Sequence, residues 1–588
     1  MKKSLLFGLC FSLLSPLFFP ASVFACGGLF CDTGPLMVNQ AAERIVFAKH
    51  GDGYVTAVVQ VLYEGESSEF GWIIPVPGVP EVGVSSNLAF TRLQTATNPT
   101  FVMNTIVEGS CKEERNNGSF NNGTSANNAT ANSADPVVAA EGNVGPYDFV
   151  VIEVPNPQPD GAMRAVEWLE NNGYMAPEGS EVLFQSYLDE GMNLLAFKLT
   201  KNADAGDIRP IIMKYQSDKP MIPIKLTGVA ANDDMGVLVW VLGNSQAITS
   251  NYKSLELNDS LFDWFFLSNY NALVIRAANE SGGQGFVTEM SEKTTSLKDV
   301  VFSDAEVRSW EEIMNRNYTQ GKDLLTDISI FLESLVQNNC FGESCISGVD
   351  GLGIALENAF PQASRTEREE LTQCLYCTSI VLAPQNFDRV KNAFKDWVVD
   401  PLVETQKLLD AEKHFTRFYT TMSAADMTID PIFEFTTSLE DVSNQHVAER
   451  VIHCNKDTYF FDAAWTTTLP SGLTVKGTDN FWPIDVNDPE IAANIVIRDI
   501  SPSSNSIVEN NRLSIIAALE SRNRKVSGRK TYDEGRDPDV FGGKEGEKGR
   551  SDGVSGGGCS TQGRSTFFFP LFALAFFVSI RRKKKNLV

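Results

Sequence analysis

The chain has 588 residues, a mass of 64.6 kDa and a formal net charge of −25. Its length suits about two to four domains, and with 43% hydrophobic residues the chain can bury packed cores. A chain this acidic repels the phosphates of DNA and RNA, so nucleic acids are excluded as partners.

Residues 1–25 predict a secretory signal peptide. Two lysines precede an apolar stretch over 5–19, and Ala25 ends a segment that suits cleavage. The stretch is short for a membrane span, which favours cleavage over an uncleaved anchor. The bulky Phe24 argues against a lipoprotein signal and leaves Cys26 free for a disulfide.

Residues 26–300 predict a β-rich α+β domain. Strand patterns fill much of 43–83 around a hairpin turn at 50–53, and Ser85 or Ser86 is placed to cap a helix over 86–97. Residues 112–145 are rich in Asn, Gly, Ser and Thr, which predicts a flexible insertion. Further strands are expected at 147–154, 193–200, 208–216, 221–229 and 236–242, and helices at 162–171, 181–189 and 269–280.

The hydrophobic period becomes helical over 301–422. Asp304 precedes Val307, Trp310 and Ile313 at helical spacing, which predicts a capped helix. Residues 423–520 return to a β-rich pattern. In the helical region we expect further helices at 321–337, 366–382 and 388–421, the last interrupted at Pro401. In the β-rich region we expect strands at 432–437, 451–454, 466–469, 473–476 and 495–500.

The last part of the chain predicts a stalk and an anchor. Residues 521–558 form a charged, glycine-rich stalk, and residues 559–588 form a tail with a single apolar membrane segment over 566–580. The segment follows Cys559 and precedes a basic cluster of Arg581, Arg582, Lys583, Lys584 and Lys585. Because basic residues stay on the cytoplasmic side, we expect the C-terminus to be cytoplasmic initially and the body to lie outside.

This order of cysteine, apolar helix and basic cluster resembles the MYXO-CTERM sorting tails of certain Gram-negative bacteria. The resemblance implies that a sorting machinery processes the tail and displays the protein at the cell surface. The alternative is a plain membrane anchor.

Eight cysteines remain after Cys10 of the signal and Cys559 of the tail are set aside. An even number in an exported chain predicts up to four disulfides, which we favour over a zinc site or a redox CxxC. Their connectivity stays open: Cys26 and Cys31 pair with each other or reach Cys111, and the block at 340–377 is expected to clip two helices together. The candidates are Cys26, Cys31, Cys111, Cys340, Cys345, Cys374, Cys377 and Cys454.

Several long segments of the chain have distinctive amino-acid sequences. They include ACGGLFCD at 25–32, GWIIPVPGVPEVGVSS at 71–86 and KPMIPIKLTGVAANDDMGVLVWVLG at 219–243. In these strings the chain resembles a family of exported bacterial proteins catalogued as domain of unknown function 2330. The resemblance implies no particular activity, cofactor or catalytic residue.

One histidine pair is a candidate for metal chemistry. His446, Glu449 and His453 would share one face of a helix, and both residue types bind zinc, but Val451 and Ile452 favour a strand. No phosphate-binding loop, nucleophile elbow or calcium loop is present.

We therefore expect an α+β protein of the cell envelope, held by the membrane, that binds or adheres to an unknown surface ligand or has a structural role. No cofactor and no catalytic residue is predicted. The alternative is an exported hydrolase or metal-dependent enzyme that uses His446, Glu449 and His453.

Overall fold

The computed structural model describes residues 41–60, 71–112, 138–154, 161–172, 174, 180–199, 208–228, 231–336, 345–378, 380–478 and 480–533. The predicted signal, the tail with its apolar segment and basic cluster, and Cys26, Cys31, Cys340 and Cys559 lie outside these residues. Within them, none of the helices combines the length and apolar composition that crossing a membrane requires.

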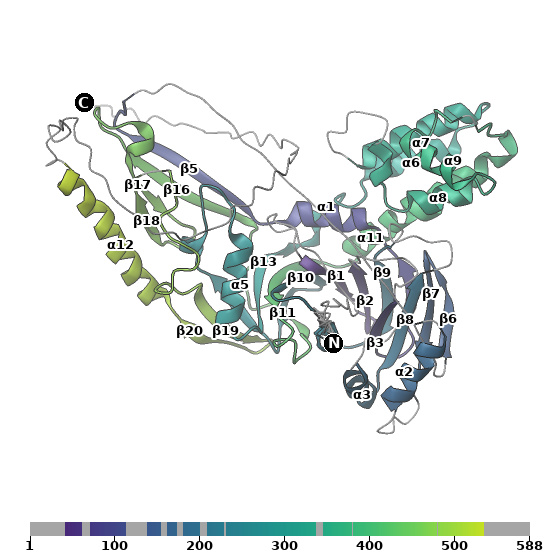
Figure 1. The fold of residues 1–588 in the computed structure, drawn as a ribbon, viewed down its shortest axis with the longest axis horizontal. Coiled ribbons are helices and arrows are strands. Elements are labelled where there is room, and N and C mark those ends of the chain that lie inside the picture. The colour runs from purple at the N-terminus through teal and green to yellow at the C-terminus, as the bar shows by residue number, and fades with distance from the viewer. Residues whose placement is uncertain are drawn as a thin grey trace, which may run out of the picture.

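A ten-stranded mixed sheet forms the centre of the fold (Figure 1). It takes strands from the N-terminal, helical and C-terminal β regions of the sequence, so the three regions share one sheet. In spatial order the strands are β20 (Ser504–Asn510), β19 (Asn494–Ser501), β12 (Lys253–Leu257), β13 (Gly285–Lys293), β14 (His414–Met422), β10 (Met235–Gly243), β1 (Ala41–Lys49), β2 (Tyr54–Gln60), β9 (Ile211–Gln216) and β4 (Glu81–Val84).

Three smaller sheets extend the structure. One four-stranded sheet has the order β3 (Gly71–Val76), β8 (Asn193–Leu199), β7 (Tyr147–Ile152), β6 (Val138–Val144). The other has the order β18 (Thr474–Gly477), β17 (Ala464–Thr468), β16 (Gln445–His453), β5 (Thr100–Glu108). The pair β11 (Gln246–Thr249) and β15 (Phe433–Thr436) forms the third.

The helices gather in distinct places. A cluster of four, α6 to α9, projects as a separate lobe in Figure 1, while α5 lies beside β13. The α-helices are α1 (Asn87–Thr97), α2 (Gly161–Asn171), α3 (Glu181–Asp189), α4 (Ile224–Thr227), α5 (Tyr270–Glu280), α6 (Asp304–Asn315), α7 (Gly321–Leu335), α8 (Leu352–Ala359), α9 (Arg365–Gln373), α10 (Phe387–Phe394), α11 (Asp400–Ala411) and α12 (Arg512–Asp533). A π-helical turn, Lys395–Val399, connects α10 and α11.

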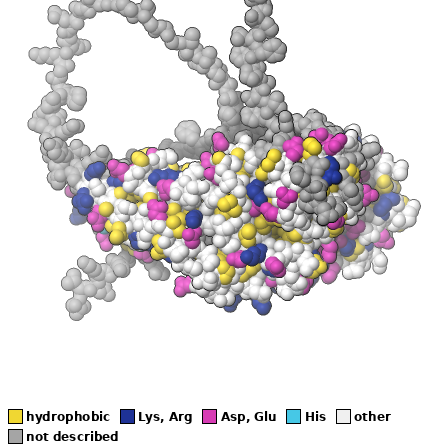
Figure 2. Space-filling model, turned by 90° about the horizontal axis from the view of Figure 1, so that it is seen from below, with side chains coloured by type: hydrophobic (Ala, Val, Ile, Leu, Met, Phe, Trp, Pro, Cys, Tyr) yellow, Lys and Arg dark blue, Asp and Glu magenta, His cyan; other side chains and the backbone are white. Residues whose placement is uncertain are grey.

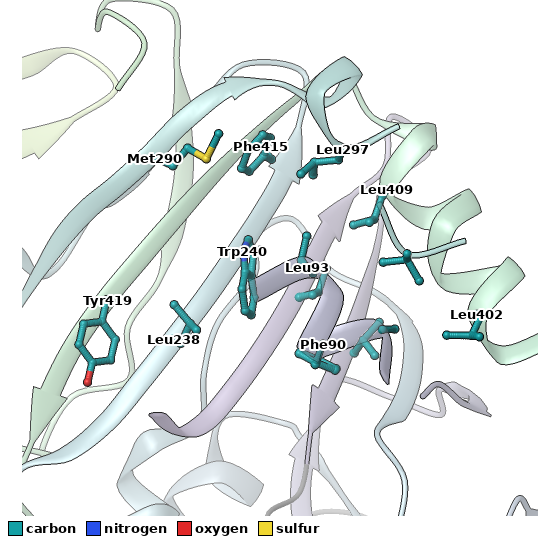
Figure 3. Packing of buried hydrophobic residues seen from close by; sticks show 14 of the residues in the cluster. Phe90, Leu93, Leu238, Trp240, Met290, Leu297, Leu402, Leu409, Phe415 and Tyr419 are labelled. Carbon is teal, nitrogen blue, oxygen red and sulfur yellow. The ribbon is translucent and has the colours of Figure 1, made fainter. Parts of the chain in front are cut away.

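The main core forms where α1 and α11 cover the centre of the large sheet (Figure 3). Every residue of β10 is buried, as its continuous apolar sequence suggests for a central strand. Trp240 of β10 packs against Phe90 of α1, with ring centroids 6.0 Å apart. On the outside, the face in Figure 2 carries acidic and basic side chains interspersed with small apolar spots, as is usual for a surface in contact with water.

Local signals predicted many elements correctly. Ser86 caps α1 as expected, since its hydroxyl accepts a hydrogen bond from the Leu88 backbone amide. In α6 the capping residue is Ser303 and not Asp304, because Ser303 and Glu306 form a reciprocal capping box.

Four predictions are wrong. The predicted flexible insertion over 112–145 includes strand β6 at Val138–Val144, which pairs with β7. The expected helix over 388–421 ends at Ala411, and β14 follows it as a buried strand of the central sheet. The expected strand over 221–229 is replaced by the short helix α4. The expected helix over 366–382 ends at Gln373. For β14 the deciding interaction is its pairing with β10 and β13, which no local pattern encodes. In addition, α12 extends into the start of the predicted stalk.

Candidate functional site: a cavity at the separated ends of β12 and β13

The strands β12 and β13 are parallel neighbours that separate after three residues. They pair only from Lys253–Leu255 to Gly285–Val287. Beyond this point β12 continues to pair with β19, and β13 continues to pair with β14. The separation therefore opens the sheet at the carboxyl end of β12, and such ends of parallel strands are frequent ligand positions in open sheets.

The opening is bounded on its far side by the segment that leads into β16. Ser291 of β13 and Val442 exchange backbone hydrogen bonds of 2.8 and 2.9 Å. A cavity of about 420 Å³ lies at this opening, lined by Leu255, Val287 and Val442 among others. Its volume falls within the range of small-molecule sites, roughly 300–1,000 Å³. We call it the β12–β13 cavity.

Aromatic rings form one wall of this cavity. Phe101 of β5 lies 4.1 Å from Phe262 and 5.6 Å from Tyr270, measured between ring centroids. His446 of β16 stacks on Phe101 at 4.9 Å with an interplanar angle of 17°, because the two residues are register partners in the parallel pair β5–β16. Burial lowers the pKa of His446, so its imidazole is neutral at physiological pH.

A buried ion pair fixes the position of Glu289 in the cavity wall. Its Oε2 accepts a hydrogen bond of 2.6 Å from Nε of Arg417, and its Oε1 accepts one of 2.7 Å from the Tyr270 hydroxyl. Arg417 also donates to Oγ1 of Thr97 and to Oδ1 of Asn98. A bulge in β13 lies at Glu289, between the paired residues Thr288 and Met290. Since both charged side chains are fully buried, the pair is a rigid part of the wall.

Asp259 is a second carboxylate in the lining. Its Oδ1 accepts a hydrogen bond of 2.6 Å from the Ser471 hydroxyl, and its Oδ2 accepts one of 2.9 Å from the Ser471 backbone amide. Burial raises the pKa of Asp259 to about 6, although these hydrogen bonds oppose the shift. Its side chain therefore titrates close to neutral pH.

Unlike the carboxylates of Glu289 and Asp259, the carboxamide of Gln246 has an oxygen that accepts no hydrogen bond within the described residues. Gln246 lines the cavity from β11 and is only 6% exposed. Its Oε1 atom is buried and accepts no hydrogen bond from any described residue. A buried acceptor without a partner costs about 1–3 kcal/mol, so a ligand donor that met Oε1 after a change of the Gln246 rotamer would recover this free energy.

The structure does not bring the three predicted metal-ligand candidates together. Because β16 is a strand, His446 lies on the opposite face from Glu449 and His453. His446 lines the cavity, whereas His453 is exposed and contacts Glu108 at 3.1 Å. Among the described residues, no group of three or more His, Cys, Asp or Glu side chains is arranged to hold a metal ion.

Two disulfides join cysteines that the sequence singled out. Cys111 bonds to Cys454 across a sequence separation of 343 residues, and it links the ends of β5 and β16. Cys374 bonds to Cys377 in the turn after α9. The second bond is local, so these two cysteines do not clip two helices together, contrary to our expectation. For Cys345 only the backbone is described.

Sequence reasoning missed most of the polar groups at this site. Gln246, Asp259, Glu289 and Arg417 were not singled out as candidates. The signal that could have indicated two of them is a charged residue within an otherwise apolar strand, as at Glu289 and Arg417. Gln246 and Asp259 carry no such signal in the sequence.

The cavity draws residues from both halves of the chain, with Phe101 and Gln246 from one and Phe418 and His446 from the other. Residues 20–308 match the model of DUF2330, an uncharacterized protein family conserved in bacteria. The resemblance seen in the sequence is thus confirmed over this range. The DUF2330 range supplies β12, β13 and β11, while β14 and β16 lie beyond it. No curated protein and no solved structure matches the chain.

Proposed function

We propose that this chain is an exported protein of the cell envelope that binds a small ligand in the β12–β13 cavity. Export and anchoring are supported by the signal-like residues 1–25 and the tail 559–588. The disulfide between Cys111 and Cys454 supports an oxidising compartment, where such bonds persist. On this proposal the body faces the outside, and the sorting machinery acts on the tail.

Ligand binding is supported above all by the unpartnered carboxamide of Gln246 in an aromatic-walled cavity. Ligand sites typically combine apolar walls with a few polar groups. Both oxygens of Glu289 and both oxygens of Asp259 already accept hydrogen bonds from the protein. Such occupied carboxylates favour a binding role over acid–base catalysis, which requires a group that can reach the substrate's proton.

Export can be tested by fractionation of cells that produce the full chain. We expect the chain in the envelope fraction, with an N-terminus at Cys26 in mass spectrometry. Recovery of the intact chain from the cytosol with its leader uncut and its cysteines reduced would refute this part of the proposal.

Binding can be tested with the neutral fluorescent probe Nile red and the purified full chain. We expect saturable binding at one site per chain. Ser254, which lines the cavity, provides the disruptive variant: the indole of Ser254→Trp would occupy the cavity and weaken binding about tenfold or more. The matched control is Ser309→Trp, at an exposed position of α6. Equal binding to both variants, or no saturable binding to the original chain, would refute a ligand site here.

A further inference from the structure

The polar groups of the β12–β13 cavity have a surplus of acceptors. The Oε1 atom of Gln246 lacks a donor. Four carboxylates line the cavity, namely Glu256, Asp259, Glu289 and Glu440, against one lining guanidinium, that of Arg498. A ligand that carries donors and positive charge would complement this wall, whereas an anion would be repelled.

Some charged side chains at the cavity already form ion pairs within the protein. The charged side chains without such a pair are the ones available to a ligand. Glu289 is neutralised by Arg417. The Nη2 atom of Arg498 lies 3.8 Å from Oε2 of Glu256, so these two charges balance one another. Glu440 is exposed and forms no ion pair with any described residue. The unbalanced charge at the cavity is therefore negative, and it is carried by Glu440 and, above its pKa of about 6, by Asp259.

Glu440 and Gln246 both line the cavity. Gln246 pairs with Thr436 in the β11–β15 sheet, and the chain reaches Glu440 shortly after Thr436. The buried acceptor and the free carboxylate thus come from neighbouring segments. One ammonium group could donate to the carboxamide and be attracted by the carboxylate.

The remaining walls suit an apolar or aromatic body. Phe101, Phe262 and Tyr270 pack together at one side of the cavity. Phe286 and Phe418, 6.2 Å apart between centroids, line another. Aromatic faces also attract cations, by about 0.5–2 kcal/mol for each contact. The aromatic walls therefore add to the preference for a cation.

We infer that the β12–β13 cavity binds a protonated amine with an aromatic or branched aliphatic body, and this inference rests on the proposed binding function. The ammonium group donates to Oε1 of Gln246 and lies in the field of Glu440. The body packs between the aromatic walls.

Three indole probes of similar size but different charge test this inference: tryptamine, a cation; tryptophol, neutral; and indoleacetate, an anion. Titration calorimetry with the full chain at neutral pH should show that tryptamine binds about tenfold or more tightly than tryptophol. Indoleacetate should bind most weakly. Equal affinities for tryptamine and tryptophol, or the highest affinity for indoleacetate, would overturn the inference.

Variants then locate the contact. Gln246→Leu removes the acceptor at similar volume and should abolish most of the preference for tryptamine over tryptophol. Gln445→Leu, at an exposed neighbouring position outside the cavity lining, is the matched control. Glu440→Gln alters an exposed side chain that the fold does not need, and it should weaken tryptamine binding several-fold. Preservation of the preference in both Gln246→Leu and Glu440→Gln would overturn the inference.

The two proposals can fail separately. Saturable Nile red binding that Ser254→Trp abolishes, together with no preference for tryptamine, would retain the cavity as a ligand site and reject the amine. If neither Nile red nor any indole binds, both proposals fail.

Discussion

The buried carboxyl group of Glu43 provides a quantitative test of the structure. Glu43 lies on β1 and is only 2% exposed, on the same face of the strand as the core residues Ile45 and Phe47. Its Oε2 atom is buried without a hydrogen-bond partner among the described residues. Burial raises the pKa of Glu43 from 4.5 to about 8. The carboxyl group is therefore protonated in the folded protein at neutral pH.

The raised pKa makes folding stability depend on pH. Below pH 4.5 both the folded and the unfolded chain hold this proton, so Glu43 makes no pH-dependent contribution to the free energy of unfolding. Between pH 4.5 and about 8 the unfolded chain releases the proton while the folded chain keeps it. The free energy of unfolding then falls with rising pH by about 1.4 kcal/mol per unit. Over this interval the loss reaches about 5 kcal/mol, an order-of-magnitude value.

The variant Glu43→Gln removes the titrating group and retains the side-chain shape. We expect the free energy of unfolding of the original chain, measured by urea denaturation, to fall relative to that of Glu43→Gln as the pH rises from about 5 to about 8. The control is Glu311→Gln, at an exposed position of α6, which should follow the original chain throughout. If the curves of the original chain and Glu43→Gln run parallel, the carboxyl group ionises as it does in water and the reasoning is refuted.

Three further variants test other interactions by urea denaturation. Arg417→Leu leaves Glu289 buried without its cation and should cost about 3–5 kcal/mol; a loss under 1 kcal/mol would contradict a buried pair. Replacing both Cys111 and Cys454 with serine opens a far longer loop than opening the local disulfide after α9, and should cost about 4 kcal/mol more on the chain-entropy model; equal losses would argue against the long-range bond. Ser303→Ala removes the capping box of α6 and should cost about 1 kcal/mol, whereas no loss would mean that the cap contributes nothing.

Part of the candidate site was visible in the sequence and part was not. His446 was singled out, but as one of three metal ligands on a helix; the strand β16 instead separates it from Glu449 and His453. Its actual neighbour, Phe101, is far away in the sequence and comes into contact through the parallel pairing of β5 with β16. Strand pairing over such distances leaves no periodic signal in either strand.

Interactions between residues a few positions apart explain the features that the sequence predicted correctly. The all-apolar run of β10 marks a central strand, Ser86 marks the start of α1, and the match over 20–308 follows from strings that can be read directly. These features depend on residues a few positions apart.

Long-range folding brings β14 into the central sheet and separates β12 from β13 to leave a cavity. It also leaves Gln246 buried there without a donor. These outcomes arise from pairing and packing between segments that are distant in the sequence, and their free energies are set by contacts that exist only once the chain has folded.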